Sequence, residues 1–208
     1  ETIKYTGNGT NGRQISHTLG EKPKMILEKG LSTTYYWAVQ GCGELWTPDT
    51  SGLFLNTRNA LNAAMCYDAP TASYFYPSLT NYANENLVEN IAILFAEVPG
   101  FSKFGTYEGN NSTDGPFVWC GFRPAFVMVK NASAASQWAM IDATRDTYNV
   151  TDARLRANIS AAEVTETFFD FVSNGFKVRG TGTDKNDSGN IYIFAAFADI
   201  PFKYARAR

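Results

Sequence analysis

The chain has 208 residues, of which 44% are hydrophobic and 14% aromatic, and this composition is typical of a globular protein and excludes a disordered one. Charged residues make up only 18% and the net charge is -2, so the sequence lacks the basic footprint of a nucleic-acid-binding protein. No apolar run approaches the roughly 18 residues that a membrane-spanning helix needs, and we expect no membrane insertion.

Short strands separated by turns are predicted along the first half of the chain. In order, the candidate strands are residues 2–5, 14–19, 24–29, 35–39, 52–56 and 90–97. They are rich in β-branched and aromatic residues, and Gly, Asn and Pro separate them. Residues 57–65 are the best candidate for a short helix in this half, although Asn59 and Asn62 weaken it.

The second half is predicted to follow the same plan. Within residues 107–138 a polar loop precedes a short apolar strand, a proline and an apolar strand that ends in Lys130. Residues 151–162 are expected to be irregular or weakly helical. Candidate strands follow at residues 167–172, 176–178 and 191–199, and Asn174-Gly175 indicates a tight hairpin between the first two.

Matching anchors at nearly constant spacing indicate an internal duplication. The motif Tyr-x-Gly-Asn begins at Tyr5 and again at Tyr107, 102 residues later. Pro23 corresponds to Pro124, 101 residues later, and the closing sequences FAEVP and FADIP again lie 102 residues apart. We therefore predict an all-β fold of two tandem duplicated β-sandwich-like or jelly-roll-like units with few short helices.

The predicted repeats are residues 1–100 and residues 101–208. We expect them to pack tightly, and they could also form one compact unit. Each closing strand is apolar on both faces, so we expect it to be central and buried. Trp37 and Trp138 are expected at equivalent places as core anchors, and ligand stacking is the alternative role.

Catalytic chemistry has little support in the sequence. His17 is the only histidine, which excludes multi-histidine metal sites, and it is expected to be exposed on a strand. Cys42, Cys66 and Cys120 form no disulfide framework and are expected to be buried thiols, with at most one bridge. We expect no cofactor and no metal, and the oxygen-rich loop with Asp184, Asn186 and Asp187 leaves calcium binding open.

Two kinds of functional residue remain as candidates. Paired carboxylates hydrolyse glycosidic bonds, but the sequence does not bring two together; the candidates are Glu44, Asp49, Asp142, Asp146, Asp152 and Asp170. Aromatic rings beside polar groups bind sugars, and they also form subunit interfaces and cores. The candidate ligand-binding residues are Tyr35, Tyr36, Trp46, Tyr74, Tyr76, Asp142 and Arg145.

The second half carries a family resemblance. The segments GFRPAFVMVK, FVSNGFKV and YIFAAFADIPFKYARAR resemble a domain found near the C-termini of bacteriophage tail-fibre and other virion structural proteins, many of them marine. The resemblance covers essentially the whole chain and is closer in the second half. In the first half Gln40 replaces Asp142 and no Arg follows in register, so a site built on Asp142 and Arg145 would exist only in the second half.

The resemblance implies a non-enzymatic virion domain on the particle surface. Its expected role is host-surface attachment, through a cell-surface glycan or protein, and its expected partners include other virion subunits. A homotrimer is expected because fibres are usually trimeric. The alternatives are a purely structural or decoration domain in virion assembly, and a polysaccharide-cleaving spike domain that uses two carboxylates.

Overall fold

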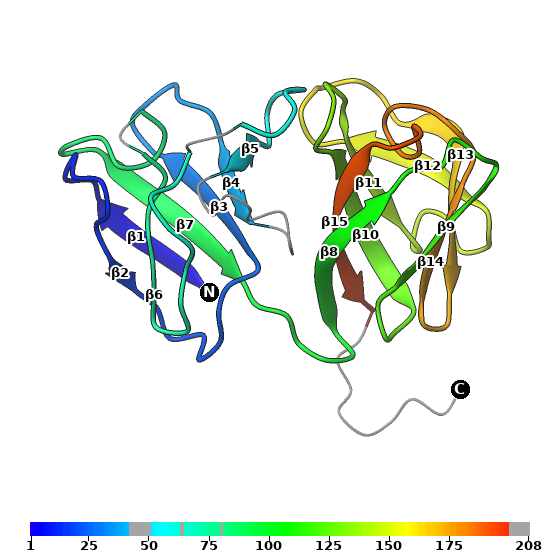
Figure 1. The fold of residues 1–208 in the computed structure, drawn as a ribbon, viewed down its shortest axis with the longest axis horizontal. Helices are drawn as coiled ribbons and strands as arrows, with labels where there is room; N and C mark the ends of the chain where they lie inside the picture. Colours follow the sequence, from blue (N-terminus) through cyan, green and yellow to red (C-terminus); the bar gives the residue numbers. More distant parts are fainter. Residues whose placement is uncertain (42–50, 63–64, 80, 200–208) are drawn as a thin grey trace.

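The computed structural model describes residues 1–41, 51–62, 65–79 and 81–199, which form strands joined by turns and loops (Figure 1). The predicted all-β fold is confirmed. No helix occurs among these residues, and so none that is long and apolar enough to cross a membrane. The prediction of a few short helices is wrong for this part of the chain.

The first half forms a five-stranded antiparallel sheet covered by a two-stranded one. The larger sheet has the order β1-β7-β3-β4-β5, with β1 Thr2–Thr6, β7 Glu89–Phe95, β3 Met25–Gly30, β4 Ala38–Gly41 and β5 Gly52–Phe54. The smaller sheet pairs β2 Ile15–Ser16 with β6 Tyr74–Phe75. Ile15 and Phe75 of the small sheet pack against Tyr5, Ile26 and Leu94 of the large one, which makes a small sandwich.

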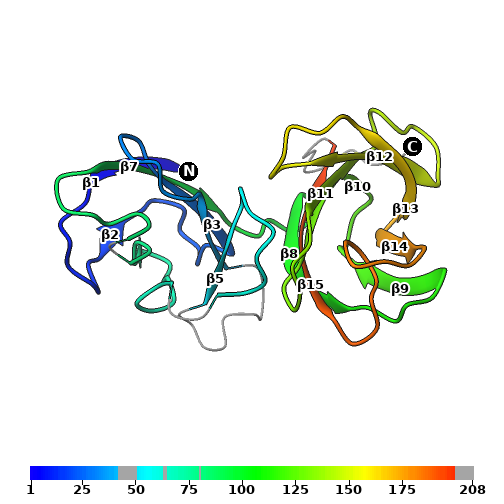
Figure 2. The same ribbon diagram turned by 90° about the horizontal axis from the view of Figure 1, so that it is seen from above.

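The second half forms one eight-stranded antiparallel sheet that curves into a nearly closed barrel (Figure 2). Its order is β8-β15-β10-β11-β12-β13-β14-β9, with β8 Ser102–Glu108, β15 Ile191–Ala198, β10 Pro124–Asn131, β11 Trp138–Asp142, β12 Thr151–Arg156, β13 Val164–Val172, β14 Gly175–Arg179 and β9 Asp114–Trp119. An aromatic core that includes Phe168, Phe169 and Phe176 fills it. The edge strands β8 and β9 face each other across an unpaired seam.

The two halves repeat one topology. The order β1-β7-β3-β4-β5 matches β8-β15-β10-β11-β12, and the closing strands β7 and β15 each lie between two partners, as predicted. The register corrects one sequence alignment: Ile26 pairs with Gln40, whereas Val127 pairs with Ile141. Gln40 is therefore the counterpart of Ile141 and does not replace Asp142.

The repeated Tyr-x-Gly-Asn motif folds against a second asparagine far along the chain. In the second copy the Tyr107 hydroxyl donates to Lys185 O (2.8 Å) and the Asn110 amide donates to Asn186 Oδ1 (2.9 Å). In the first copy Tyr5 donates to Ala83 O and the Asn8 amide donates to Asn84 Oδ1. The motif is thus a structural clasp between the start of a repeat and the loop before its closing strand.

Replacing Gly109 with alanine is expected to destabilise the protein by about 3 kcal/mol. A Cβ atom there would lie 2.2 Å from Asp187 O, and this neighbour is backbone that cannot swing away. Urea denaturation measures the loss, with exposed Glu108→Ala as the control. Equal stability of the two variants would show that the loop yields and that the glycine is not needed for close approach.

The two repeats share a core. Along β15, Tyr192, Phe194 and Ala196 point into the barrel, while Ile193 and Ala195 point outward and pack with Met25 and Val39 of the first repeat. Both faces of this strand are therefore apolar because each covers a different core. Figure 1 shows the two sheets side by side, connected by the segment between β7 and β8.

Trp138 is the central side chain of this shared core. It is 1% exposed, and its indole Nε1 donates to Phe54 O of the first repeat at 2.8 Å. Trp37 holds the equivalent backbone position, since the Trp37 amide donates to Asn56 Oδ1 as the Trp138 amide does to Asn158 Oδ1. Trp37 is only half-buried, so one of the two tryptophans is a core anchor.

Loop contacts explain why residues 57–62, the described start of the helix predicted at 57–65, are not helical. The Leu61 amide donates to Ala132 O of the second repeat, and Asn62 makes a β-bridge with Gly52. A segment of weak helix propensity gains more from these contacts than from a single helical turn. Residues 151–162 likewise contribute the strand β12 and do not become helical.

Candidate functional site

The predicted tyrosines lie in two separate parts of the first repeat. Tyr36, 46% exposed, packs against Phe54 in a tilted arrangement with ring centroids 4.7 Å apart. Tyr74 and Tyr76 contact each other at 5.6 Å, and Tyr67 lies 5.6 Å from Tyr76. No ring contact joins the two groups in the described part of the chain.

The remaining first-half candidates add little to either group. The Tyr35 hydroxyl hydrogen-bonds to Glu85, which raises the pKa of the tyrosine, and the carbonyl of Tyr35 accepts from Lys29 Nζ at 2.8 Å. Trp46 lies outside the described residues, as do Cys42 and the carboxylates Glu44 and Asp49.

Asp142 and Arg145 close a turn at the end of β11. The Asp142 carboxylate accepts from the amides of Thr144 (3.0 Å) and Arg145 (2.9 Å), and its Oδ2 lies 2.6 Å from Arg145 Nε. Arg145 also contacts Glu163. Burial alone would raise the pKa of Asp142, but the hydrogen bonds and charge of Arg145 outweigh it and the pKa is lowered. Both side chains of the pair are therefore already bonded to neighbouring protein groups.

The oxygen-rich loop is also engaged internally. Asp184 pairs with Arg154 (2.7 Å) and accepts from the Gln137 amide, and Asn186 donates to Asn110 Oδ1 and Ser112 O. Within residues 1–41, 51–62, 65–79 and 81–199, no group of three or more His, Cys, Asp or Glu side chains is placed to hold a metal ion.

The histidine and the described cysteines are buried. His17 is 8% exposed, contrary to the prediction of an exposed strand residue: Nδ1 accepts from the Leu19 amide and Nε2 donates to Thr71 O (3.0 Å). Cys66 and Cys120 are free thiols, as predicted. Burial raises the pKa of Cys120 to about 12, so this thiol is not a nucleophile near neutral pH.

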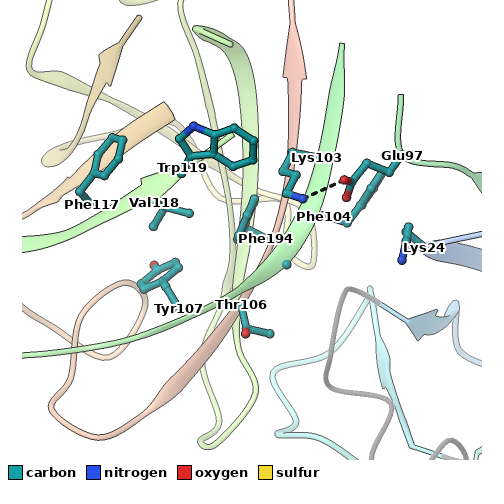
Figure 3. A pocket seen from close by; sticks show the side chains of 11 residues that line it. Lys24, Glu97, Lys103, Phe104, Thr106, Tyr107, Phe117, Val118, Trp119 and Phe194 are labelled. Carbon is teal, nitrogen blue, oxygen red and sulfur yellow. Dashed lines mark hydrogen bonds and ion pairs between the residues drawn. The ribbon is translucent and has the colours of Figure 1, made fainter. Parts of the chain in front are cut away.

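A groove of about 450 Å³ lies along the seam between β8 and β9 (Figure 3). Its lining residues come from the first repeat, the connecting segment, both edge strands and β15: Lys24, Glu97, Lys103, Phe104, Gly105, Thr106, Tyr107, Phe117, Val118, Trp119 and Phe194. The volume is in the range of small-molecule sites. The groove is open along its length, since β8 and β9 do not pair.

Strand alternation in β9 produces an exposed aromatic surface on the groove. Val118 points into the barrel core, whereas Phe117 is 48% and Trp119 is 59% exposed. An added Cβ on Gly121 would lie 3.1 Å from the Trp119 ring, so the indole rests directly on this glycine. Successive residues of a strand point to opposite faces, and the two aromatic rings are thereby presented together.

Charged groups stand beside the tryptophan. Lys103 Nζ lies 5.6 Å from the centre of the Trp119 ring and forms an ion pair of 2.8 Å with Glu97. Figure 3 shows Lys24 beyond Glu97 at the far end of the groove. The buried Phe194 ring lies beneath Gly105, which leaves room for it because it has no side chain; a Cβ on Gly105 would lie 3.0 Å from the ring.

Sequence reasoning did not find this groove. Trp119 lies inside the repeated stretch, which suggested a structural role. However, the register gives Ser16 as the counterpart of Trp119: Ile15 pairs with Phe75 as Val118 pairs with Phe176, and Ser16 and Trp119 come next in their strands. The sequence signal that could have located the groove is the pair Phe117 and Trp119, at positions i and i+2 of a strand whose other face is apolar.

Comparison with known proteins identifies a family without assigning an activity. No curated protein matches the chain, and no solved structure matches it. A family model described as a domain of unknown function, DUF7483, matches residues 1–201, and the chain therefore belongs to that family.

Proposed function

We propose that the protein is a non-enzymatic glycan-binding domain of a bacteriophage appendage, exposed on the virion surface and used for attachment to the host. The observation that carries the binding role is the exposed pair Phe117 and Trp119 beside the charged groups Lys103 and Glu97. The virion context is supported by the sequence resemblance to tail-fibre C-termini. From the same resemblance we propose a homotrimer with other virion subunits as partners.

The groove has the chemistry of a saccharide site. Pyranose rings stack their C–H faces on indole and phenyl rings, and nearby polar groups select the hydroxyls. Trp119 supplies the larger platform, and Lys103, Glu97 and Thr106 supply donors and acceptors along the groove. An open groove admits a segment of a long polysaccharide, which an enclosed cavity would not.

Hydrolysis of the bound glycan receives no support from the described carboxylates. Glycoside hydrolysis uses two carboxyl groups that flank the bond, and Glu97 is the single one among the described residues that line the groove. Asp146 accepts hydrogen bonds from the Asp152 and Ala153 amides, and Asp170 lies 3.4 Å from Arg179.

A structural role in virion assembly is the second candidate, and one observation favours it. The edge strands β8 and β9 leave the barrel open at the groove, and an unpaired edge can bind a strand of another subunit. Exposed tryptophan and phenylalanine side chains are also typical of interfaces. Attachment requires a glycan in the groove and assembly requires part of another subunit there, so a glycan-binding measurement separates the two functions.

Replacing Trp119 with alanine is expected to weaken glycan binding by about tenfold or more, because an aromatic platform at the centre of a site carries much of the affinity. A glycan array identifies ligands of the wild-type protein, and titration calorimetry compares the variants. Tyr148→Ala is the matched control, since Tyr148 is 84% exposed and does not line the groove. A wild-type protein that binds no glycan while its oligomers form normally would overturn the proposal in favour of assembly.

A further inference from the structure

The groove has a charge pattern that a neutral sugar does not require. Lys24 and Lys103 face a single acidic residue, Glu97, so the three side chains sum to one positive charge. The whole chain carries a net charge of -2, and the groove is thus a positive site on a negative protein. Charge of one sign concentrated in a groove raises the local concentration of ligands of the opposite sign.

The two lysines are not equivalent. Lys103 is bound to Glu97 at 2.8 Å and lies over the Trp119 ring, so its charge is largely compensated in the free protein. Lys24 has no ion pair among the described residues, although it is half-buried. Its backbone is fixed, because the Lys24 amide donates to Phe95 O at 2.7 Å at the end of β7.

The groove also spans the two repeats. Trp119 and Lys103 belong to the barrel, while Lys24 precedes β3 of the first repeat. The shared core around Trp138 holds the repeats together, so the distance between the aromatic platform and the Lys24 charge is set by the fold. A ligand that contacts both ends must present a ring to Trp119 and an anionic group toward Lys24.

We propose that the ligand is an acidic saccharide, with a sugar ring on Trp119 and a carboxylate or sulfate group at Lys24, which makes Lys24 the residue that selects acidic over neutral glycans. This inference rests on the proposed glycan-binding function and specifies its substrate class. The anionic group meets Lys24 without displacing Glu97 from Lys103. Selectivity for acidic chains therefore depends on a residue of the first repeat, although the platform lies in the second.

Lys24→Gln tests the inference with a change that keeps side-chain length and removes the charge. We expect affinity for an acidic glycan to fall about two- to fivefold, since partly exposed ion pairs contribute modestly. Affinity for its neutral counterpart should stay unchanged. Lys24→Glu reverses the charge and should weaken acidic binding further. Lys22→Gln is the matched control, because Lys22 is exposed two residues away and does not line the groove.

The probes are paired oligosaccharides of equal length: uronic-acid oligomers with their carboxyl-reduced forms, and sulfated oligomers with their desulfated forms. Affinities are measured on the full chain at low and high salt, because the Lys24 contribution should shrink as salt screens exposed charges. Preference for the uronate or for the sulfate members identifies the anionic group. Equal affinity for acidic and neutral members, with Trp119→Ala still weakening both about tenfold, overturns this inference and leaves glycan binding standing. Affinity that is unchanged in Trp119→Ala overturns the proposed function itself.

Discussion

Replacing Trp138 with alanine is expected to lower the free energy of unfolding by about 4 kcal/mol, because the change leaves a large cavity in a closely packed core. Trp138 is 1% exposed and packs between the repeats. The substitution also removes the donor to Phe54 O, and a buried carbonyl left without a partner adds to the cost. Urea denaturation followed by circular dichroism measures the change.

Trp37→Ala is the matched control, since Trp37 holds the equivalent backbone position and is half-buried. Its cost should be less than half that of Trp138→Ala. Trp138→Phe keeps an aromatic ring and removes the N–H group, so it isolates the hydrogen bond, with an expected cost of about 1–3 kcal/mol. Equal losses for the two alanine variants would contradict the inter-repeat role of Trp138.

The closing strands show what an apolar sequence pattern can predict and what it cannot. An apolar strand on both faces predicts a central, buried strand, and β7 and β15 confirm this. The pattern does not say what covers each face. In β15 one face belongs to the barrel and the other to the neighbouring repeat, and this depends on packing between segments about 150 residues apart, such as Val39 and Ile193.

The repeated turn motif shows a similar limit. Tyr-x-Gly-Asn was recognisable as a repeat, but its partners Asn84 and Asn186 lie 76 residues from the motif asparagines. Lys29 and Lys130, which end the repeated strands, bind loop carbonyls: Lys29 Nζ contacts Thr33 O, and Lys130 Nζ contacts Asn131 O. The sequence identified these anchors, and the structure supplied the bonds that explain them.

The candidate site was harder to predict because exposure depends on the fold. The five aromatic candidates in the first half suggested one site, yet Tyr36 and Tyr76 belong to different ring groups. Trp119 is exposed because β9 is an edge strand, and no local pattern marks an edge. The two repeats differ at this place, since the register gives Ser16 as the counterpart of Trp119.

A buried carboxyl group distinguishes the first repeat from the second. Glu28 is fully buried, and the second repeat has Val129 at the corresponding position, 101 residues later. Its Oε2 accepts from the Ser78 amide (3.0 Å) and hydroxyl (2.6 Å) and from Gln40 Nε2, and no cation is paired with it in the described residues. Burial raises the pKa of Glu28, and these hydrogen bonds only partly offset it.

The hydrogen-bond geometry is compatible with a proton on Glu28 Oε1. The Tyr5 hydroxyl lies 2.7 Å from Ala83 O and 2.9 Å from Glu28 Oε1, but it has one proton to donate. Its counterpart Tyr107 donates to the equivalent carbonyl, Lys185 O. If Tyr5 does the same, the Oε1 atom of Glu28 must supply the proton for the second bond, as a neutral carboxylic acid does.

The raised pKa sets the sign of the pH dependence. Below the ordinary pKa of 4.5, Glu28 is protonated in both the folded and the unfolded chain, and its contribution to stability is complete. As pH rises from there toward the raised pKa of the folded state, the unfolded chain loses this proton and the folded protein keeps it. Stability attributable to Glu28 therefore falls with rising pH through this window and levels off above the folded-state pKa.

Glu28→Gln should remove this decline and leave the protein at least as stable as the wild type at neutral pH. The amide NH₂ group donates to the Tyr5 oxygen in place of the carboxylic acid proton, and the amide oxygen keeps the bonds from Ser78. Urea denaturation across acid to neutral pH measures both effects. Glu89→Gln is the control, since Glu89 forms an exposed pair with Lys4. A Glu28→Gln protein that is destabilised at every pH would show that Glu28 is ionised in the folded state.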